Sequence, residues 1–235
     1  MPAKTISHDA DLGRFAEKQM RNWEIARCQN PTSASRAEVA DFITIANIVG
    51  AGGKQVATEL ARSLGWPAYD RDLLTRMAGD DEARAGLYHS MDERDLGWLE
   101  VTLRTLIEQE FRKNDYFHRL VETVLCLARQ GPAIFVGRSA DLILARSKGL
   151  RVKLIASMEY CAACFAEVNH VTIEHARSEV ARIEAERHGF IRNHFRLHDA
   201  DLMRFDLLLN VERFSTEQIV ALIRAAHQLR CSPAA

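Results

Sequence analysis

Hydrophobic residues along the chain occur either in short continuous runs or in longer stretches with helical spacing. The runs at residues 42–46, 132–137, 152–156 and 206–211 are short and rich in β-branched or other aliphatic residues, so each predicts a buried strand. Residues 67–69 predict a further, very short strand. Because stretches with helical spacing separate these runs, the pattern predicts an α/β fold with a mainly parallel sheet.

Apolar residues three and four positions apart predict the helices that connect the strands. These stretches cover residues 56–64, 93–112, 116–129, 172–195 and 216–228. Gly65 follows the first stretch and is typical of a helix end. Near the N-terminus, a polar helix over residues 12–27 precedes a segment with Pro31, which indicates a helical arm and linker over residues 1–40. The main domain is therefore expected to cover residues 41–235.

The composition fits an ordered, compact domain. Of the 235 residues, 47% are hydrophobic and 27% charged, which supplies a full core and argues against disorder. The 31 basic and 32 acidic residues nearly balance, so general nucleic-acid binding is not expected. The five cysteines suggest no disulfide framework and the N-terminus resembles no signal sequence, so a cytoplasmic location is expected. No apolar run is long enough to span a membrane.

In parallel α/β folds, ligands bind where strands end and helices begin. That rule selects three places: residues 46–54, the Tyr69–Asp70 step and the Gly137–Arg138 step. Residues 46–54 give the most specific signal for a ligand site, because a Gly-rich loop follows a predicted strand and begins a predicted helix. Its small residues let backbone N–H groups face an anion, and Lys54 is expected to reach the outer phosphates of a nucleotide.

The loop departs from the usual phosphate-loop pattern at two positions. In the pattern G-x-x-x-x-G-K-S/T, Gly53 and Lys54 fit, whereas Ile48 replaces the first Gly and Gln55 replaces the hydroxyl residue. That hydroxyl normally holds Mg²⁺, and Gln is a poor replacement for it. The competing interpretation is a Gly-rich turn that serves only tight packing of the strand against the helix. The predicted phosphate site consists of Gly50, Ala51, Gly52, Gly53, Lys54 and Gln55.

Five segments, in the same order as in a known family, carry a resemblance to it. The first is FITIANIVGAGGKQVATELARSLGWPAYDRDLL, and the others are MDERDLGWLE, GPAIFVGRSADLIL, LRVKLIASMEY and AERHGFIRNHFRLHDADLMRFDLLLNVERFSTEQIVALI. Together they resemble the cytidylate kinase-like proteins, relatives of bacterial cytidylate kinase among the P-loop nucleoside-monophosphate kinases. The resemblance covers residues 41–226.

The resemblance implies a three-layer P-loop kinase-like fold with five parallel strands in the order 2-3-1-4-5. It also implies a helical acceptor-binding insert over residues 79–129 and a lid over residues 172–196. The implied activity is ATP-dependent phosphorylation of CMP, dCMP or a related small acceptor, with ATP and Mg²⁺ as cofactors. The expected partners are nucleotides, without nucleic acid or membrane. Trp98 on the helix predicted over residues 93–112 either packs within the protein or contacts a second subunit in a homodimer.

Family roles can be carried over to individual positions of this chain. The phosphate loop matches Gly50, Gly52, Gly53 and Lys54; the acceptor-binding residues match Asp70, Arg76 and Arg138; the lid matches Arg182, Arg187 and Arg192; and the end of the last strand matches Asn210 and Arg213. Lys54, Arg138 and Arg187 are the expected catalytic residues, because phosphoryl transfer needs cations around the phosphates. Arginine suits this task because its planar guanidinium binds phosphate oxygens through two N–H groups.

Several positions depart from the family pattern. Ser139 stands where cytidylate kinase has Asp, and Glu184 opens the lid motif in place of Asp. Cys161 and Cys164 occupy a segment in which relatives carry arginines over the donor base. The departures imply a weakened donor and metal side, while the acceptor side keeps its charged residues.

Three functions stay open at this point: a kinase for a small phosphorylated acceptor, a nucleotide-binding pseudokinase with a sensing or scaffolding role, and a structural α/β protein. The pair Cys161 and Cys164, with His170 and His175 close behind, also matches part of a zinc pattern. Two thiols one turn apart on a half-buried helix are more often packing residues, so packing is the preferred interpretation. No protein ligand for a metal is predicted.

Overall fold

The computed structural model describes residues 39–89, 91, 99–103, 115–146, 148–195, 197 and 202–231. The predicted N-terminal helix and its linker lie outside these residues, as does most of the predicted helix over residues 93–112, of which residues 99–103 are helical. The chain divides into two compact units. We call residues 41–73 and 132–235 the sheet unit, and residues 1–40 and 74–131 the helical unit.

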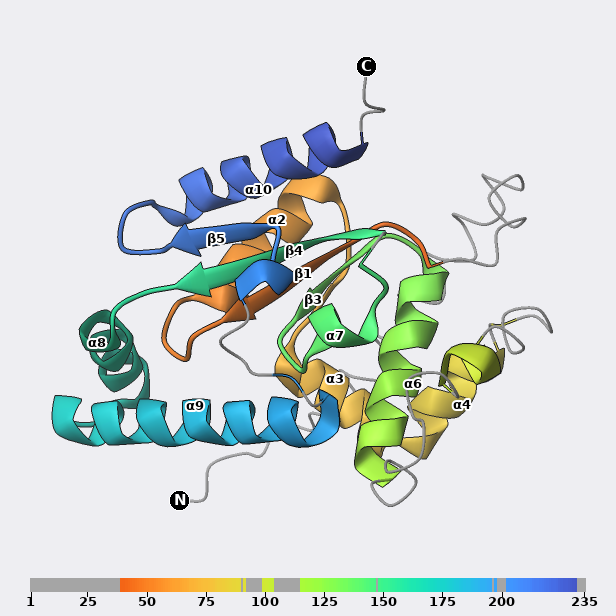
Figure 1. Ribbon diagram of the computed structural model, residues 1–235, viewed down its shortest axis with the longest axis horizontal. Helices are drawn as coiled ribbons and strands as arrows, with labels where there is room; N and C mark the ends of the chain where they lie inside the picture. The colour runs from red at the N-terminus through yellow and green to blue at the C-terminus, as the bar shows by residue number, and fades with distance from the viewer. Residues whose placement is uncertain are drawn as a thin grey trace, which may run out of the picture. The chain divides into compact units, whose positions relative to one another are not determined.

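Parallel strands form the centre of the sheet unit. They are β1 (Phe42–Asn47), β2 (Ala68–Tyr69), β3 (Ala133–Val136), β4 (Gly149–Ile155) and β5 (Leu207–Asn210). Their order is β2-β3-β1-β4-β5 and all neighbours are parallel (Figure 1), so the expected fold class and strand order are confirmed. In the central strand, Phe42, Ile43 and Ile45 are almost fully buried, as expected for a strand covered on both faces.

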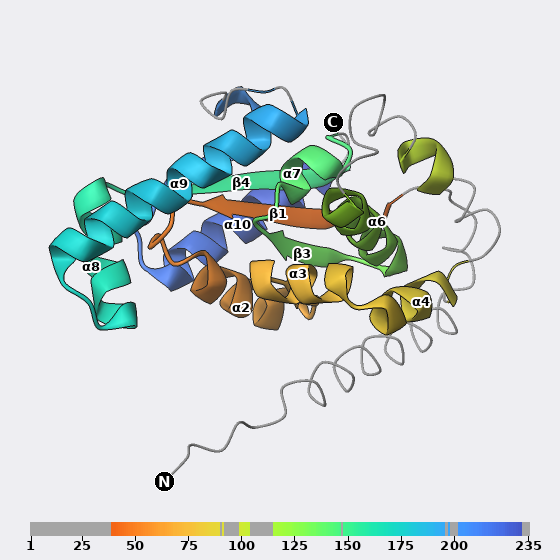
Figure 2. The same ribbon diagram turned by 90° about the horizontal axis from the view of Figure 1, so that it is seen from below.

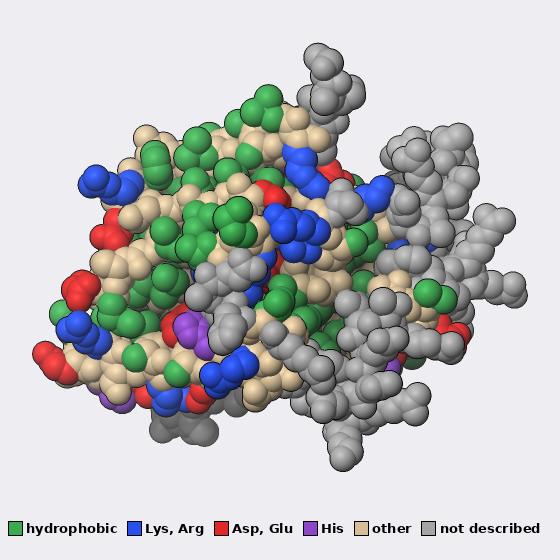
Figure 3. Space-filling view, viewed as in Figure 1, with side chains coloured by type: hydrophobic (Ala, Val, Ile, Leu, Met, Phe, Trp, Pro, Cys, Tyr) green, Lys and Arg blue, Asp and Glu red, His purple; other side chains and the backbone are tan. Residues whose placement is uncertain are grey.

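One face of the sheet is covered by α2 (Gly53–Leu64) and α10 (Thr216–Cys231). Leu60 from α2 and Ile223 from α10 pack with Ile45 and Val152 in one buried cluster. These helices match the predictions for residues 56–64 and 216–228. At the sheet edge, hydrophobic side chains lie at the surface over β5 and α10 (Figure 3), and Leu208 is 40% exposed.

The other helices of the sheet unit surround the carboxyl ends of the strands. They are α7 (Ala140–Ile143), α8 (Met158–Asn169) and α9 (Ile173–Phe195), followed by the 3₁₀ turn η3 (Leu202–Arg204). α8 and α9 lie side by side in both views (Figures 1 and 2). Alternate residues of β4 point to opposite faces. Because Val152 and Leu154 enter the core with α2 and α10, Arg151 and Lys153 face the opposite side of the sheet.

The described part of the helical unit contains α4 (Asp81–His89) and α6 (Asp115–Gln130), while α3 (Arg71–Gly79) begins in the sheet unit and ends in the helical unit. Buried Glu122 on α6 accepts a hydrogen bond from Arg84 Nη2 at 2.7 Å and lies 2.9 Å from His118 Nε2. The described part of the predicted insert is thus helical, and its acceptor-binding role stays a prediction. Within the described helices, none is long and apolar enough to cross a lipid bilayer.

Candidate functional site

The loop between β1 and α2 uses glycine where the backbone is left-handed or crowded. Gly50 has φ 90° and Gly52 has φ 68°, conformations that glycine adopts without a Cβ penalty. A Cβ on Gly50 would lie 2.4 Å from the carbonyl oxygen of Cys161, and one on Gly53 would lie 2.4 Å from Asn47 Oδ1. Both local conformation and tertiary packing therefore require glycine in this loop.

The same loop opens α2 with backbone N–H groups that have no acceptor inside the helix. Gly52 is the N-cap and makes no side-chain capping bond, and the first bond back to it comes from the N–H of Val56, at 3.2 Å. The N–H groups of Gly53, Lys54 and Gln55 come before that bond. Together with the helix dipole, they form a place that favours an anion.

Lys54 at the start of α2 pairs with Asp70 at the end of β2. The distance from Lys54 Nζ to Asp70 Oδ2 is 3.0 Å. The other oxygen of Asp70 accepts hydrogen bonds from the N–H groups of Asp72 and Leu73 and caps α3. Partial burial raises the pKa of Asp70, but these N–H groups and the Lys54 ammonium outweigh that effect and hold the pKa below its ordinary value. The structure thus brings together two predicted site residues that follow different strands, β1 and β2.

The loop offers a phosphate site more readily than a metal site. At the position of the usual hydroxyl, Gln55 carries an amide, which is a weaker oxygen donor to Mg²⁺ than a carboxylate. Among the residues that the structure describes, no three His, Cys, Asp or Glu side chains converge in a way that could hold a metal ion.

The turn after β3 contains three consecutive residues in the left-handed region. Gly137 has φ 71°, Arg138 φ 52° and Ser139 φ 55°. Non-glycine residues adopt this region rarely, at a cost of about 1–2 kcal/mol each. The turn is anchored to the central strand, because the N–H of Gly137 donates to the carbonyl of Ile45 at 3.0 Å. This geometry places Arg138 at the carboxyl end of β3, next to β1.

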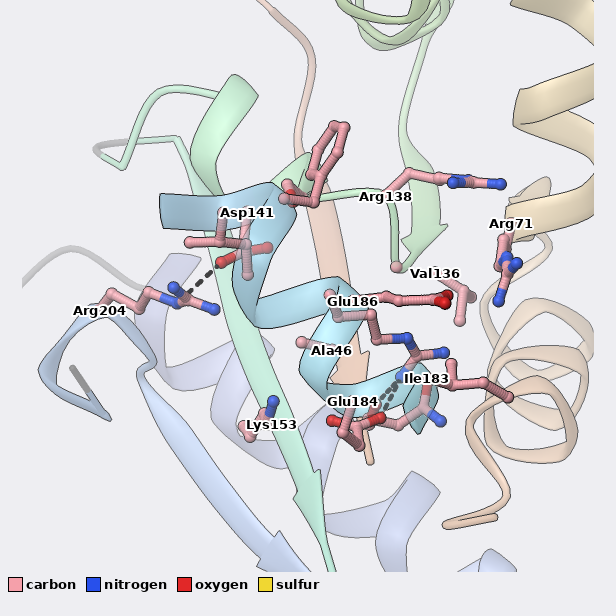
Figure 4. A pocket seen from close by; sticks show the side chains of 16 residues that line it. Ala46, Arg71, Val136, Arg138, Asp141, Lys153, Ile183, Glu184, Glu186 and Arg204 are labelled. Atoms are coloured by element: carbon pink, nitrogen blue, oxygen red, sulfur yellow. Dashed lines mark hydrogen bonds and ion pairs between the residues drawn. The ribbon is translucent and has the colours of Figure 1, made fainter. Parts of the chain in front are cut away.

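A cavity of about 290 Å³ lies between these turns and α9 (Figure 4). It is lined by Ala46, Asn47, Arg71, Val136, Gly137, Arg138, Ser139, Asp141, Lys153, Ile183, Glu184, Glu186, Arg187, Phe190, Ile191 and Arg204. These include five cationic side chains and three carboxylates, so the lining carries an excess of positive charge. The cavity is suited to an anionic ligand.

α9 contacts the beginning of the phosphate loop directly. Arg187 Nη1 donates to the carbonyl of Asn47 at 2.9 Å and to Glu184 Oε1 at 2.8 Å, and the same Glu184 oxygen accepts the N–H of Val49 at 3.0 Å. Ile183 packs beside them. In this structure, the helix that sequence analysis identified as a lid therefore forms one wall of the cavity.

The predicted lid arginines do not share one location. Arg187 lines the cavity, whereas Arg182 pairs with Glu179 and Glu186 along the exposed surface of α9. Arg192 is exposed on the same helix. Arg76 lies on α3, in the part that belongs to the helical unit.

Sequence reasoning did not find Arg71, Lys153 and Arg204, which also line the cavity. The alternation along β4 carried a signal for Lys153, because a lysine in an otherwise buried strand must face a polar space or solvent. For Arg204 in η3 there was no comparable pattern. At the end of β5, Asn210 accepts the N–H of Glu212 through its side chain, so this predicted position forms a turn.

Cys161 lies in a packing cluster. It is fully buried with Val49, Ala51 and Val180, and burial raises the pKa of its thiol to about 11. The thiol is therefore protonated at neutral pH. This environment agrees with the packing interpretation for Cys161.

With the loop, the cavity and the strand order in place, comparison with known proteins identifies the family. Residues 42–213 match the model of the cytidylate kinase-like family. The chain belongs to this family. Membership supports a nucleotide-dependent, kinase-like function and a nucleotide-binding P-loop fold. No curated protein sequence matches the chain.

Several solved structures resemble the chain. An uncharacterized protein from Eubacterium ventriosum has a TM-score of 0.60 and 18% identity, with 78% of this chain and 98% of that chain covered. A shikimate kinase from Acinetobacter baumannii in complex with shikimate gives 0.46 and 14%, covering 83% and 97%. A gluconokinase from Sinorhizobium meliloti gives 0.43 and 16%, covering 82% and 95%. The first of these shares the fold; the other two differ too much in structure to support an inference.

Proposed function

We propose that this member of the family is an ATP-dependent phosphotransferase for a small phosphorylated acceptor, with CMP or dCMP as the first candidates. The positions of the phosphate loop and the cavity on the sheet support the proposal. The Gly-rich loop with Lys54 and the cation-lined cavity with Arg138 stand at the carboxyl ends of two neighbouring strands. That is where parallel α/β folds bind ligands, and it provides one site for a donor next to one site for an acceptor.

The geometry supports a division of tasks among these residues. The N–H groups of Gly53 to Gln55 suit the donor phosphates, and Lys54 suits the oxygens of the group that is transferred. Arg138 and Arg187 suit the acceptor phosphate and the charge that develops during transfer. A bound Mg²⁺ would neutralise phosphate charge. Such chemistry consists mostly of positioning and charge stabilisation, which these residue types supply.

The size of the cavity is consistent with a small acceptor. Its volume of about 290 Å³ lies near the lower end of the roughly 300–1,000 Å³ range of small-molecule sites. The apolar side chains of Val136, Phe190 and Ile191 line it together with the cations. A compact ligand with a phosphate and a partly apolar body fits this mixture.

A coupled assay with ATP and a panel of phosphorylated acceptors tests the proposal. We expect turnover with at least one acceptor, and Lys54→Ala should lower kcat/KM by about 100-fold or more because it removes a cation from the transferring phosphate. The control is Arg62→Ala on the same helix, where Arg62 is 69% exposed and pairs only with Glu59 among the described residues. No turnover with any acceptor, although ATP binds, would contradict the proposal.

A specific observation favours the pseudokinase as second candidate. Gln55 replaces the metal-binding hydroxyl, so Mg²⁺ placement is weakened. Thermal unfolding with ATP, with and without Mg²⁺, measures this directly, because a ligand of the folded state raises its apparent stability. Gln55→Thr should increase Mg²⁺-dependent turnover if the protein is a kinase. A pseudokinase would gain stability from ATP without gaining turnover from this substitution.

A further inference from the structure

The cavity has a second group of cations away from Arg138. Lys153 projects from β4 and Arg204 ends η3, and both line the cavity. Figure 4 shows them on one side of the cavity, while Arg71 and Arg138 lie on the other. The tasks assigned above use only the side of Arg138, so the side of Lys153 has no assigned ligand group.

The carboxylate nearest to this group in the fold is already engaged. Asp141 Oδ2 lies 3.1 Å from Arg204 Nε, and both side chains are well under a tenth exposed. Arg151 is buried on the same face of the sheet, where its Nη2 donates to the carbonyl of Leu144 at 2.8 Å. Asp206 Oδ2 also accepts the backbone N–H of Arg151, at 2.8 Å. Two carboxylates, Asp141 and Asp206, thus lie among the three cations Arg151, Lys153 and Arg204, and the group as a whole stays positive.

Among the residues that the structure describes, no carboxylate lies within 4 Å of the Lys153 ammonium, and Asp141 interacts with it electrostatically from farther away. The ammonium also makes a cation–π contact with Phe205, at 5.6 Å from the ring centroid. That distance is near the outer limit of about 6 Å for such contacts. A half-buried ammonium without a carboxylate is energetically unfavourable. An anionic ligand in the cavity would remove that penalty.

We propose that Lys153 and Arg204 bind a second anionic oxygen group of the acceptor, at the end of the cavity opposite Arg138. Lysine and arginine offer only hydrogen-bond donors, so they match a carboxylate or a second phosphate better than a neutral base with an amino group. The excess of cations in the lining agrees with a ligand that carries more than one charged group. The inference rests on the proposed function, because it concerns the acceptor of the same site.

Pairs of ligands that differ by one carboxylate test this inference by isothermal titration with the full chain. One pair is UMP and orotidine 5′-monophosphate; the other is glycerol 3-phosphate and 3-phosphoglycerate. In at least one pair, the carboxylate-bearing member should bind about tenfold more tightly, the scale of one charge-assisted hydrogen bond. A preference in the first pair points to a nucleotide acceptor, and a preference in the second alone points to a smaller phosphorylated acid.

Variants of Lys153 then test whether this side chain causes the preference for the carboxylate-bearing ligands. Lys153→Gln should abolish it while leaving the affinity for the member without the carboxylate nearly unchanged, and Lys153→Arg should keep it. Arg62→Gln on α2 is the control with an unchanged preference, and thermal unfolding verifies that each variant is folded. If Lys153→Gln does not fold, the affinities of the paired ligands for the wild-type protein still test whether the cavity binds a second anionic group.

Equal affinities within both pairs for the wild-type protein would overturn the inference. So would an equal loss of affinity for all four ligands in Lys153→Gln, because that result describes a general effect on the site. Titration with ATP separates this failure from that of the proposed function. If ATP and plain phosphate esters bind and only the preference is missing, the inference alone fails; if neither binds, both fail.

Discussion

The turns after β1 and β3 reverse the chain with different types of residue at their left-handed positions. Both leave neighbouring parallel strands and both pass through the left-handed region of backbone conformation. The first does so at Gly50 and Gly52, and the second at Gly137 followed by Arg138 and Ser139. The first turn is therefore relaxed at its left-handed positions, whereas the second holds two side chains in a conformation that they rarely adopt.

The two turns present different groups to a ligand. In the first turn, backbone N–H groups form the anion site, and a Cβ on Gly50 would collide with the backbone of Cys161. In the second, the guanidinium of Arg138 lines the cavity, so glycine cannot replace it. Strain at Arg138 is consistent with a functional side chain that the surrounding structure holds in place.

The largest effect is expected from Gly50→Ala. Its left-handed φ and the 2.4 Å distance of the new Cβ to the Cys161 oxygen require the backbone to move, so stability should fall by about 3 kcal/mol or more. Gly65→Ala is the matched control, because Gly65 has a similar φ but no atom within 4 Å of its Cβ position; its loss should be about 1 kcal/mol. Urea unfolding measures both. Equal losses would show that packing on Cys161 is unimportant.

The second prediction separates strain from binding at Arg138. Arg138→Ala should weaken acceptor binding by about 1.5–3 kcal/mol, the scale of a charge-assisted hydrogen bond, and leave ATP binding nearly unchanged. Arg138→Gly should lose the same affinity but be more stable than the Ala variant by about 1 kcal/mol, because glycine tolerates φ 52°. Titration with CMP and ATP, together with urea unfolding, provides the data. Equal weakening of both ligands would favour a structural role for Arg138.

The third prediction compares two arginines of α9. Arg187 touches the phosphate loop and the cavity, so Arg187→Ala should reduce kcat/KM by roughly tenfold or more. Arg182 pairs with Glu179 and Glu186 at the surface, so Arg182→Ala should have a smaller effect. Steady-state kinetics of both variants under one set of conditions measures the difference. A reversed order would mean that α9 changes position during turnover and brings Arg182 to the phosphates.

The smallest effect concerns the charge next to the first turn. Asp70 caps α3 and pairs with Lys54. Because Lys54 is 75% exposed, the ion pair itself is weak. Asp70→Ala should therefore lower the free energy of unfolding by about 1 kcal/mol, mostly from the lost cap. The folded protein holds the pKa of Asp70 below its ordinary value of 3.8. The stabilisation is therefore fully present above that value and is lost as the pH falls through the folded-state pKa.

Urea unfolding between neutral pH and pH 2 tests the sign of this dependence. The difference between wild type and Asp70→Ala should stay constant near neutral pH and shrink below pH 3.8. Asp70→Asn keeps a capping side chain without the charge and should lie between the two. A difference that grows toward low pH would contradict the direction of the shift.

The sequence by itself determined the parts that depend on neighbouring residues. Short continuous apolar runs predicted the strands, and stretches with helical spacing predicted the helices α2, α9 and α10, because each segment must bury its own apolar side chains. The glycines at positions 50, 52 and 53 predicted the loop, and the left-handed conformation at Gly50 and Gly52 is the part of it that local sequence determines. The family resemblance added the strand order, which local patterns do not contain.

Tertiary structure alone decided which charged side chains meet. The bond from the Val49 N–H to Glu184 joins positions 135 residues apart, and the pairing of Asp141 with Arg204 depends on how η3 packs against α7. Lys153 reaches the cavity only because β4 lies beside β1 and turns that face toward α9. A long polar side chain has many partners of similar energy within a sequence, and only the packing of distant elements determines which of them lies close enough to interact.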